Sequence, residues 1–387
     1  MAKRTAAALL LGLAAAFAQA APFTPAGDAE VVEKLPTSAD PTLRSVESMR
    51  RQLASRPGDA ALRLEIAQRY FDLAMAQGDP RFVGYASATI APLEKSAPGD
   101  ARYWLLRGLL QQYSHDFDNA LQSLRRASEI DPQAVAPVAW RAAIRMVQAK
   151  YAEAQPECER LAAIAQPLIA QGCSAYVQAS TGKLREAYEG LAQAVAASEQ
   201  LDPGVALWLQ TRLAEMALRL QRPEEAERHY RAALDQRITD QFLLGSYADF
   251  LLARGRPAEA LKLLAGWERS DILLLRLALA GQAARDPRAA DWVKQLRERF
   301  AAAAQRGDRL HEQEAARWEL DIEHDASRAL AYARTNYERQ REARDAEILL
   351  RAAVAAKQPQ AAQPALEWLR ASGYEDPQLQ KLAEALR

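Results

Sequence analysis

The stretch Ala101–Pro132, ARYWLLRGLLQQYSHDFDNALQSLRRASEIDP, decides the fold of this chain. Apolar residues recur in it at helical spacing on either side of a short polar segment around His115, which predicts two helices joined by a tight turn. Bulky Trp104 is followed by the small residues Gly108 and Ala120, an order that suits two antiparallel helices crossing closely. We therefore expect a helical hairpin.

The order Trp, Gly, Ala, a large apolar residue, Ala and Pro resembles a tetratricopeptide repeat (TPR). The small residue of the second helix recurs at Ala86, Ala120, Ala154, Ala187, Ala226, Ala260, Ala289, Ala329 and Ala362. Five of the eight steps between these positions lie within one residue of 34. The resemblance covers 59–371 and implies an all-α, right-handed superhelical solenoid of about eight to nine helix-turn-helix repeats.

Capping helices are expected at both ends of the solenoid, because a terminal repeat has a neighbour on one side only. The sequence predicts one cap beginning at Pro41 and a last helix beginning at Pro377. The first repeat is about seven residues longer than the others. Either the turn over 77–85 projects as a contact loop, or the two helices of the pair are longer.

The N-terminus has the pattern of a secretory signal peptide over residues 1–20. Two basic residues precede an apolar run over 6–17, and Ala-Gln-Ala at 18–20 matches the small-x-small cleavage pattern. We predict cleavage before Ala21, a flexible leader over 21–40 and a solenoid over 41–387. The alternative is an uncleaved anchor helix. The sequence thus predicts a periplasmic protein with no membrane-spanning segment after cleavage.

The chain has only two cysteines, Cys158 and Cys173. The repeat pattern places them on neighbouring helices, and an exported protein meets an oxidising compartment, so they can pair. Such a disulfide would stabilise the fold by roughly 3 kcal/mol. The alternative is two separate buried thiols. Neither arrangement is typical of catalysis, because no His lies nearby in the sequence.

Composition and motifs argue against an enzyme and against a nucleic-acid-binding protein. The 50 basic and 50 acidic residues cancel, so no overall positive field favours nucleic acid. His311-Glu312-Gln313-Glu314 resembles the start of a zinc-protease helix, but Ala315 stands where the second His is required. We expect no catalytic, metal or cofactor site; an enzyme using His311 or His324 is the weakest hypothesis.

The best candidates for binding lie on the face of the first helices that lines the concave surface in the TPR family. Over 207–220, a stripe distinct from the leucine stripe is formed by Trp208, Arg212, Glu215 and Arg219. An aromatic beside an arginine is typical of a binding hot spot. Further candidates on the corresponding stripe of other repeats are Trp140, Met146, Tyr176, Phe242 and Asp249. The matched Lys and Asn residues with which some family members hold a C-terminal carboxylate are absent.

Arg107 and Arg141 stand one repeat apart in first-helix positions that usually hold Leu in the family. Two explanations stay open. Their stems can pack while the guanidinium groups reach water, or the pair can receive an acidic group of a partner.

These features lead to two hypotheses of function. The first is a non-enzymatic periplasmic scaffold or adaptor that binds a protein or peptide along its concave groove, in an envelope, export or assembly complex. The second is a periplasmic polysaccharide or cell-wall glycan binder that supports export, in which Trp140 and Trp208 stack on sugars. The same repeat serves many unrelated complexes, so the sequence does not name the partner.

Overall fold

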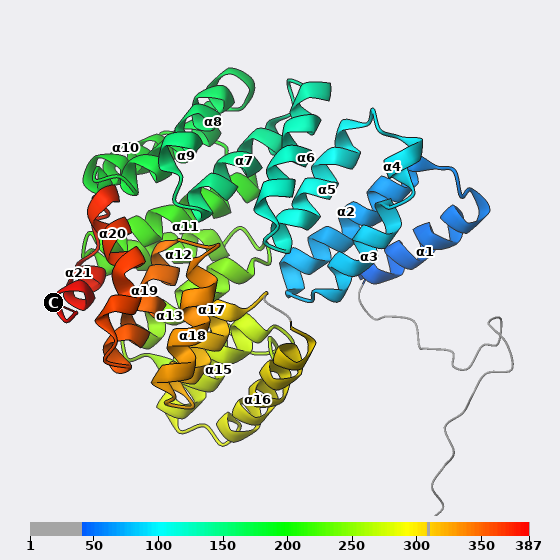
Figure 1. Cartoon of the computed structure of the whole chain (residues 1–387). Coiled ribbons are helices and arrows are strands. Elements are labelled where there is room, and N and C mark those ends of the chain that lie inside the picture. The colour runs from blue at the N-terminus through cyan, green and yellow to red at the C-terminus, as the bar shows by residue number, and fades with distance from the viewer. Residues whose placement is uncertain (1–40, 308–309, 387) are drawn as a thin grey trace, which may run out of the picture. The chain divides into compact units, whose positions relative to one another are not determined.

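The computed structural model describes residues 41–307 and 310–386 (Figure 1). The predicted signal peptide and leader lie outside the described residues. The chain divides into two compact units after Glu47. The structure describes residues 41–47 of the first unit, which form the start of helix α1 (Pro41–Ser55). The predicted helix therefore does begin at Pro41. The second unit contains all the other helices.

Every regular element in the described ranges is a helix, and the helices of the second unit follow one another as antiparallel pairs (Figure 1). The first helices are α2 (Ala60–Gln77), α5 (Ala101–Tyr113), α7 (Val135–Val147), α9 (Pro167–Ala179), α11 (Pro203–Arg219), α13 (Gln241–Ala253), α15 (Asp271–Ala284), α17 (Glu312–Asp321) and α19 (Ala343–Ala355). Their partners are α3 (Arg81–Ile90), α6 (Phe117–Ile130), α8 (Tyr151–Ile164), α10 (Leu184–Ala196), α12 (Pro223–Leu234), α14 (Pro257–Leu263), α16 (Ala289–Arg306), α18 (Ala326–Tyr337) and α20 (Gln363–Ser372). Shorter elements are α4 (Leu93–Ser96), the 3-10 helix η1 (Pro359–Ala362) and α21 (Pro377–Glu384). The predicted all-α solenoid of TPR-like hairpins is confirmed.

The recurring alanines that gave the repeat count are all buried, and each lies in a second helix or in η1. The two helices of one pair cross at a short distance from each other. At Gly108 an added Cβ would lie 2.7 Å from Leu124 Cγ and 3.3 Å from the backbone oxygen of Ala120. Small residues therefore recur because two helix backbones approach each other there.

The long first hairpin owes its length to its first helix, since α2 has 18 residues and α3 only 10. Helix α2 continues to Gln77, Gly78 ends it at a φ of 65°, and α3 already begins at Arg81. Of the two explanations for the extra residues, a longer helix is therefore the one that the structure shows, but only for α2. The far end of the hairpin contacts a later repeat, since the Gln241 side chain donates a hydrogen bond to the Met75 carbonyl at 3.0 Å.

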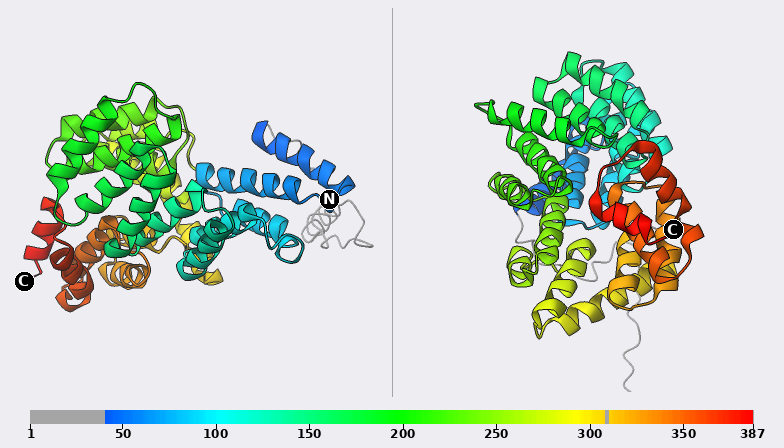
Figure 2. Two further views of the ribbon diagram at one scale, coloured as in Figure 1. Left: turned by 90° about the horizontal axis from the view of Figure 1, so that it is seen from above. Right: turned by 90° about the vertical axis from the view of Figure 1, so that its left-hand side faces the viewer.

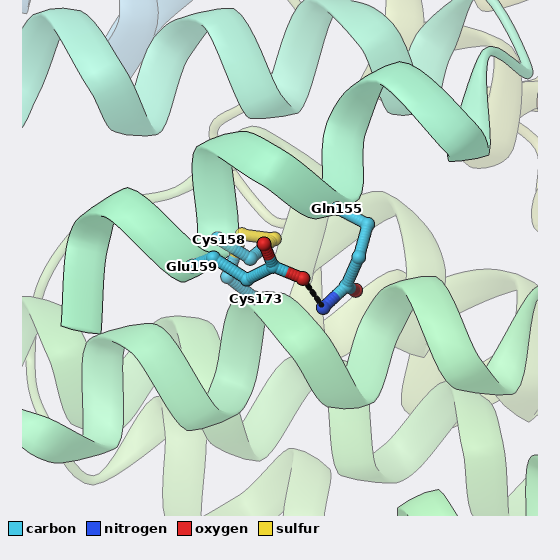
Figure 3. The surroundings of a disulfide bond; sticks show 4 residues. All are labelled: Gln155, Cys158, Glu159 and Cys173. Atoms are coloured by element: carbon cyan, nitrogen blue, oxygen red, sulfur yellow. Dashed lines mark hydrogen bonds between the residues drawn. A yellow bond between two sulfur atoms is a disulfide. The ribbon is translucent and has the colours of Figure 1, made fainter.

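Cys158 on α8 and Cys173 on α9 form a disulfide, with their Cα atoms 5.4 Å apart (Figure 3). Both residues are buried in a cluster that also contains Met146 and Leu161. On the adjoining turn of α8, Gln155 donates a hydrogen bond to Glu159 at 3.2 Å. The bridge covalently joins two consecutive repeats.

Candidate binding surface on the first helices

Arg212 lies at the centre of a stack of side chains from four first helices. Its guanidinium carbon is 4.5 Å from the centroid of the Tyr176 ring and 4.7 Å from that of Phe242. The guanidinium of Arg344, from α19, also packs on Phe242 and lies 5.1 Å from the ring centroid. A cation over the face of an aromatic ring is attracted by the ring's quadrupole. We call Tyr176, Arg212, Phe242 and Arg344 the arginine–aromatic stack.

Acidic side chains surround this stack. Arg212 Nη1 donates to Glu215 at 2.8 Å and to the Tyr176 hydroxyl at 3.2 Å. Arg344 pairs with Glu342 at 2.6 Å. Burial raises the pKa of Glu215. Burial also disfavours the charged form of Glu342, but Arg344 and Arg212 outweigh it and hold the pKa of that carboxyl below its ordinary value.

Asp249, a further predicted site residue, binds two arginines of the chain itself. Arg276 from α15 reaches it at 2.9 Å, and Arg317 from α17 reaches it at 2.8 Å. Burial works against ionisation of Asp249, yet the two guanidinium groups keep its pKa below the ordinary value. The Asp249 carboxylate therefore links α13, α15 and α17 through ion pairs.

Two of the predicted groove residues do not lie on an open surface. Met146 is buried in the cluster around the disulfide, because the register of α7 turns it toward α8 and α9. Arg219 is buried with its guanidinium carbon 3.7 Å from the centroid of the Tyr374 ring, and its Nε donates to the Glu375 carbonyl at 2.9 Å. These two candidate groove residues are therefore covered by other parts of the chain.

The two candidate tryptophans are partly buried. The ring of Trp140 packs edge-on against Phe71, with centroids 6.5 Å apart. The ring of Trp208 lies against Gly172, where an added Cβ would be 2.9 Å from it. Each indole therefore fills space between repeats, and neither is a free aromatic platform of the kind that stacks on sugars.

The C-terminal segment packs against helices from the middle of the chain (Figure 2). Trp368 donates to the Tyr151 hydroxyl at 3.0 Å, although 217 positions separate the two residues. The Glu375 carboxylate accepts from the Leu184 backbone N–H at 2.9 Å. The Arg341 backbone N–H donates to the Val147 carbonyl at 2.8 Å. We call these contacts, together with those of Tyr374 and Glu375 with Arg219, the C-terminal joint. It explains why Arg219 is covered.

Arg107 and Arg141 differ from each other. Arg107 is partly exposed and pairs with Glu94 at 2.8 Å, as expected for a guanidinium that reaches toward water. Arg141 is only 7% exposed and bonds Glu157 through Nε and Nη2 at 2.7 and 2.6 Å. The explanation in which the stem packs and the guanidinium reaches water fits Arg107. It is wrong for Arg141.

The histidines singled out by the sequence, His311 and His324, belong to no cluster of metal ligands in the part of the chain that the structure describes. His311 precedes α17 with its Nδ1 4.0 Å from Glu314 Oε2. Burial, together with His311, lowers the pKa of His115 to about 4. Within the described residues no group of three or more His, Cys, Asp or Glu side chains is placed to hold a metal ion. In the same ranges no helix has both the length and the apolar character needed to cross a bilayer.

No protein-family model matches the chain, and no curated protein is significantly similar to it in sequence. Solved structures are similar in fold. The APC/C hetero-tetramer Cut9–Hcn1 aligns with a TM-score of 0.50 and 13% identity, over 89% of this chain and 67% of that one. PilW, a type IV pilus biogenesis factor, aligns with a TM-score of 0.37 and 20% identity, over 55% of this chain and 98% of its own. The TPR domain of P58(IPK) aligns with a TM-score of 0.27 and 14% identity, over 85% and 97%. At such identities the similarity concerns fold alone: this chain has the α-solenoid fold of TPR proteins.

Proposed function

We propose that this chain is a non-enzymatic TPR scaffold of the bacterial periplasm that binds a protein or peptide partner in an envelope, export or assembly complex. The proposed contact surface is the arginine–aromatic stack with its neighbour Asp249. One observation carries the proposal: Nε of Arg212 is buried without a hydrogen-bond acceptor among the described residues, although the Arg212 side chain as a whole is 16% exposed. A buried donor without an acceptor costs about 1–3 kcal/mol, so a partner oxygen that reaches this N–H when the side chains of the stack shift would be favoured there.

The geometry of the stack suits such a partner. The Arg212 guanidinium is held between two rings, so little side-chain entropy remains to be lost when it binds a carbonyl or carboxylate oxygen. Solvent reaches the side chains around Arg212, since those of Arg344 and Asp249 are 43% and 32% exposed. A polypeptide offers backbone carbonyls and acidic side chains of the kind that this surface would accept.

Two further features support export to an oxidising compartment. The N-terminal sequence has the pattern of a signal peptide, and disulfides such as Cys158–Cys173 persist in the periplasm but are rare in the cytosol. A glycan ligand is less well supported, because Trp140 and Trp208 pack against neighbouring repeats.

Replacing Arg212 with Lys tests the proposed surface. Lysine keeps the positive charge beside Glu215 but loses the planar stack and the Nε donor. We expect the amount of the partner protein recovered by in vivo crosslinking and pull-down from periplasmic extract to fall about tenfold, as for the loss of ~1.5 kcal/mol. Thermal unfolding by circular dichroism checks that the variant is folded.

The matched control is Arg185→Lys, a surface change on second helix α10. It should capture the same protein as the wild type. Equal capture by the Arg212 variant, the control and the wild type would show that the arginine–aromatic stack is not the contact surface.

A further inference from the structure

A second set of arginines surrounds a cavity on the second helices, away from the arginine–aromatic stack. The cavity has a volume of about 400 Å³ and lies between α6 and α8, with α7 beneath it. Its polar lining consists of Arg125, Ser128, Glu129, Arg141, Glu157 and Arg160. This volume lies at the small end of the range for ligand pockets and suits one side chain or a small molecule.

Buried Arg141 forms the rigid floor of this cavity. Its Nε and Nη2 hold both oxygens of Glu157, while Nη1 donates to the Ser128 hydroxyl at 2.8 Å and to the Leu124 carbonyl at 3.4 Å. A guanidinium has five N–H groups. Four are used in these bonds, so one N–H of Arg141 has no acceptor among the described residues.

The charges around the cavity do not cancel. Arg141 neutralises Glu157, and Arg126, just outside the lining, pairs with Glu129 at 3.1 Å. Arg125 and Arg160 are exposed, and neither makes an ion pair or hydrogen bond with any residue in the described ranges. Two uncompensated guanidinium groups therefore come from neighbouring second helices to one cavity.

We propose that this cavity is a binding site for a carboxylate, contributed by an acidic side chain of a peptide. The planar fork of Arg matches the two oxygens of a carboxylate. The carboxylates of Glu129 and Glu157 in the lining disfavour a doubly charged phosphate more than a singly charged carboxylate. Arg125 and Arg160 contact the ligand, and Arg141 with Glu157 fixes the floor. The site is independent of the proposed function, because it lies on different helices from the stack.

The test uses the full chain and two fluorescently labelled peptides, one with six glutamates and one with six glutamines, in fluorescence anisotropy titrations at low salt. The variant is Arg125→Gln/Arg160→Gln. The matched control is Arg185→Gln/Arg228→Gln, which removes two exposed arginines from second helices outside the cavity. We expect the glutamate peptide to bind the wild type and the control equally, and the variant about tenfold more weakly.

Competition with acetate and with inorganic phosphate tests the chemistry of the site. Stronger displacement of the glutamate peptide by acetate than by phosphate at equal concentration supports a carboxylate site. Equal or stronger displacement by phosphate would overturn that assignment. Equal affinity of the two peptides for the wild type, or equal losses in the variant and the control, would show that the cavity is not an anion site.

Discussion

A Tyr374→Ala variant is expected to lose about 3 kcal/mol of unfolding free energy, the cost typical of deleting a buried aromatic side chain. Tyr374 is only 8% exposed and packs against Trp368, with ring centroids 5.0 Å apart. Its ring also covers the guanidinium of Arg219 at 3.7 Å. Removing it leaves a cavity in the C-terminal joint and takes away the aromatic face against which that buried cation packs.

Urea unfolding followed by circular dichroism measures this loss, and Tyr85→Ala is the matched control. Tyr85 is 52% exposed on α3, and its truncation should cost less than about 1 kcal/mol. The comparison separates the general effect of losing a tyrosine from the specific effect at the joint. Equal stability losses in the two variants would contradict the packing described for Tyr374.

Loss of the disulfide is the second change with a large expected effect. Cys158→Ser/Cys173→Ser should lower the unfolding free energy by roughly 3 kcal/mol, because the bridge closes a loop with a sequence separation of 15 and restricts the unfolded chain. Both cysteines are buried, so the new hydroxyls would add a small desolvation cost.

Reductant provides an internal control for this experiment. Dithiothreitol should shift the urea midpoint of the wild type toward that of the double variant and leave the variant's own midpoint unchanged. A wild type that keeps its midpoint after complete reduction, verified by thiol titration, would show that the bridge does not stabilise the fold.

The repeat architecture could be predicted from the sequence because it depends on local spacing. Small residues such as Ala120 are buried where the two helices of one pair cross, and the same packing requirement returns in each repeat. The same reasoning placed Cys158 and Cys173 on neighbouring helices, which the disulfide joins. It also placed Tyr176, Arg212 and Phe242 on corresponding faces of successive first helices, where their side chains do stack.

Contacts between distant repeats have no repeating pattern in the sequence. Arg344 completes the stack from α19, and its position in the sequence gives no sign that it meets Phe242. Arg219 matched the spacing of the binding stripe, but Tyr374 and Glu375 cover it. A 34-residue period describes how neighbours pack; it does not describe how far the solenoid turns before later repeats meet earlier ones.

The C-terminal helices pack against helices of the middle repeats, and an engineered crosslink tests this packing most directly. A Cβ built on Gly182 lies 3.5 Å from the Gly373 carbonyl oxygen. We predict that Gly182→Cys/Gly373→Cys forms a disulfide in the folded chain under mild oxidation, identified by mass spectrometry of the linked peptides. The control pair is Gly182→Cys/Gly255→Cys: Gly255 has a φ of 69°, close to the 66° of Gly373, so both pairs carry the same backbone strain, and no atom lies within 4 Å of a Cβ built on Gly255. A 182–373 link in high yield, without a 182–255 link, is the predicted result; equal yields, or no 182–373 link, would contradict the C-terminal joint.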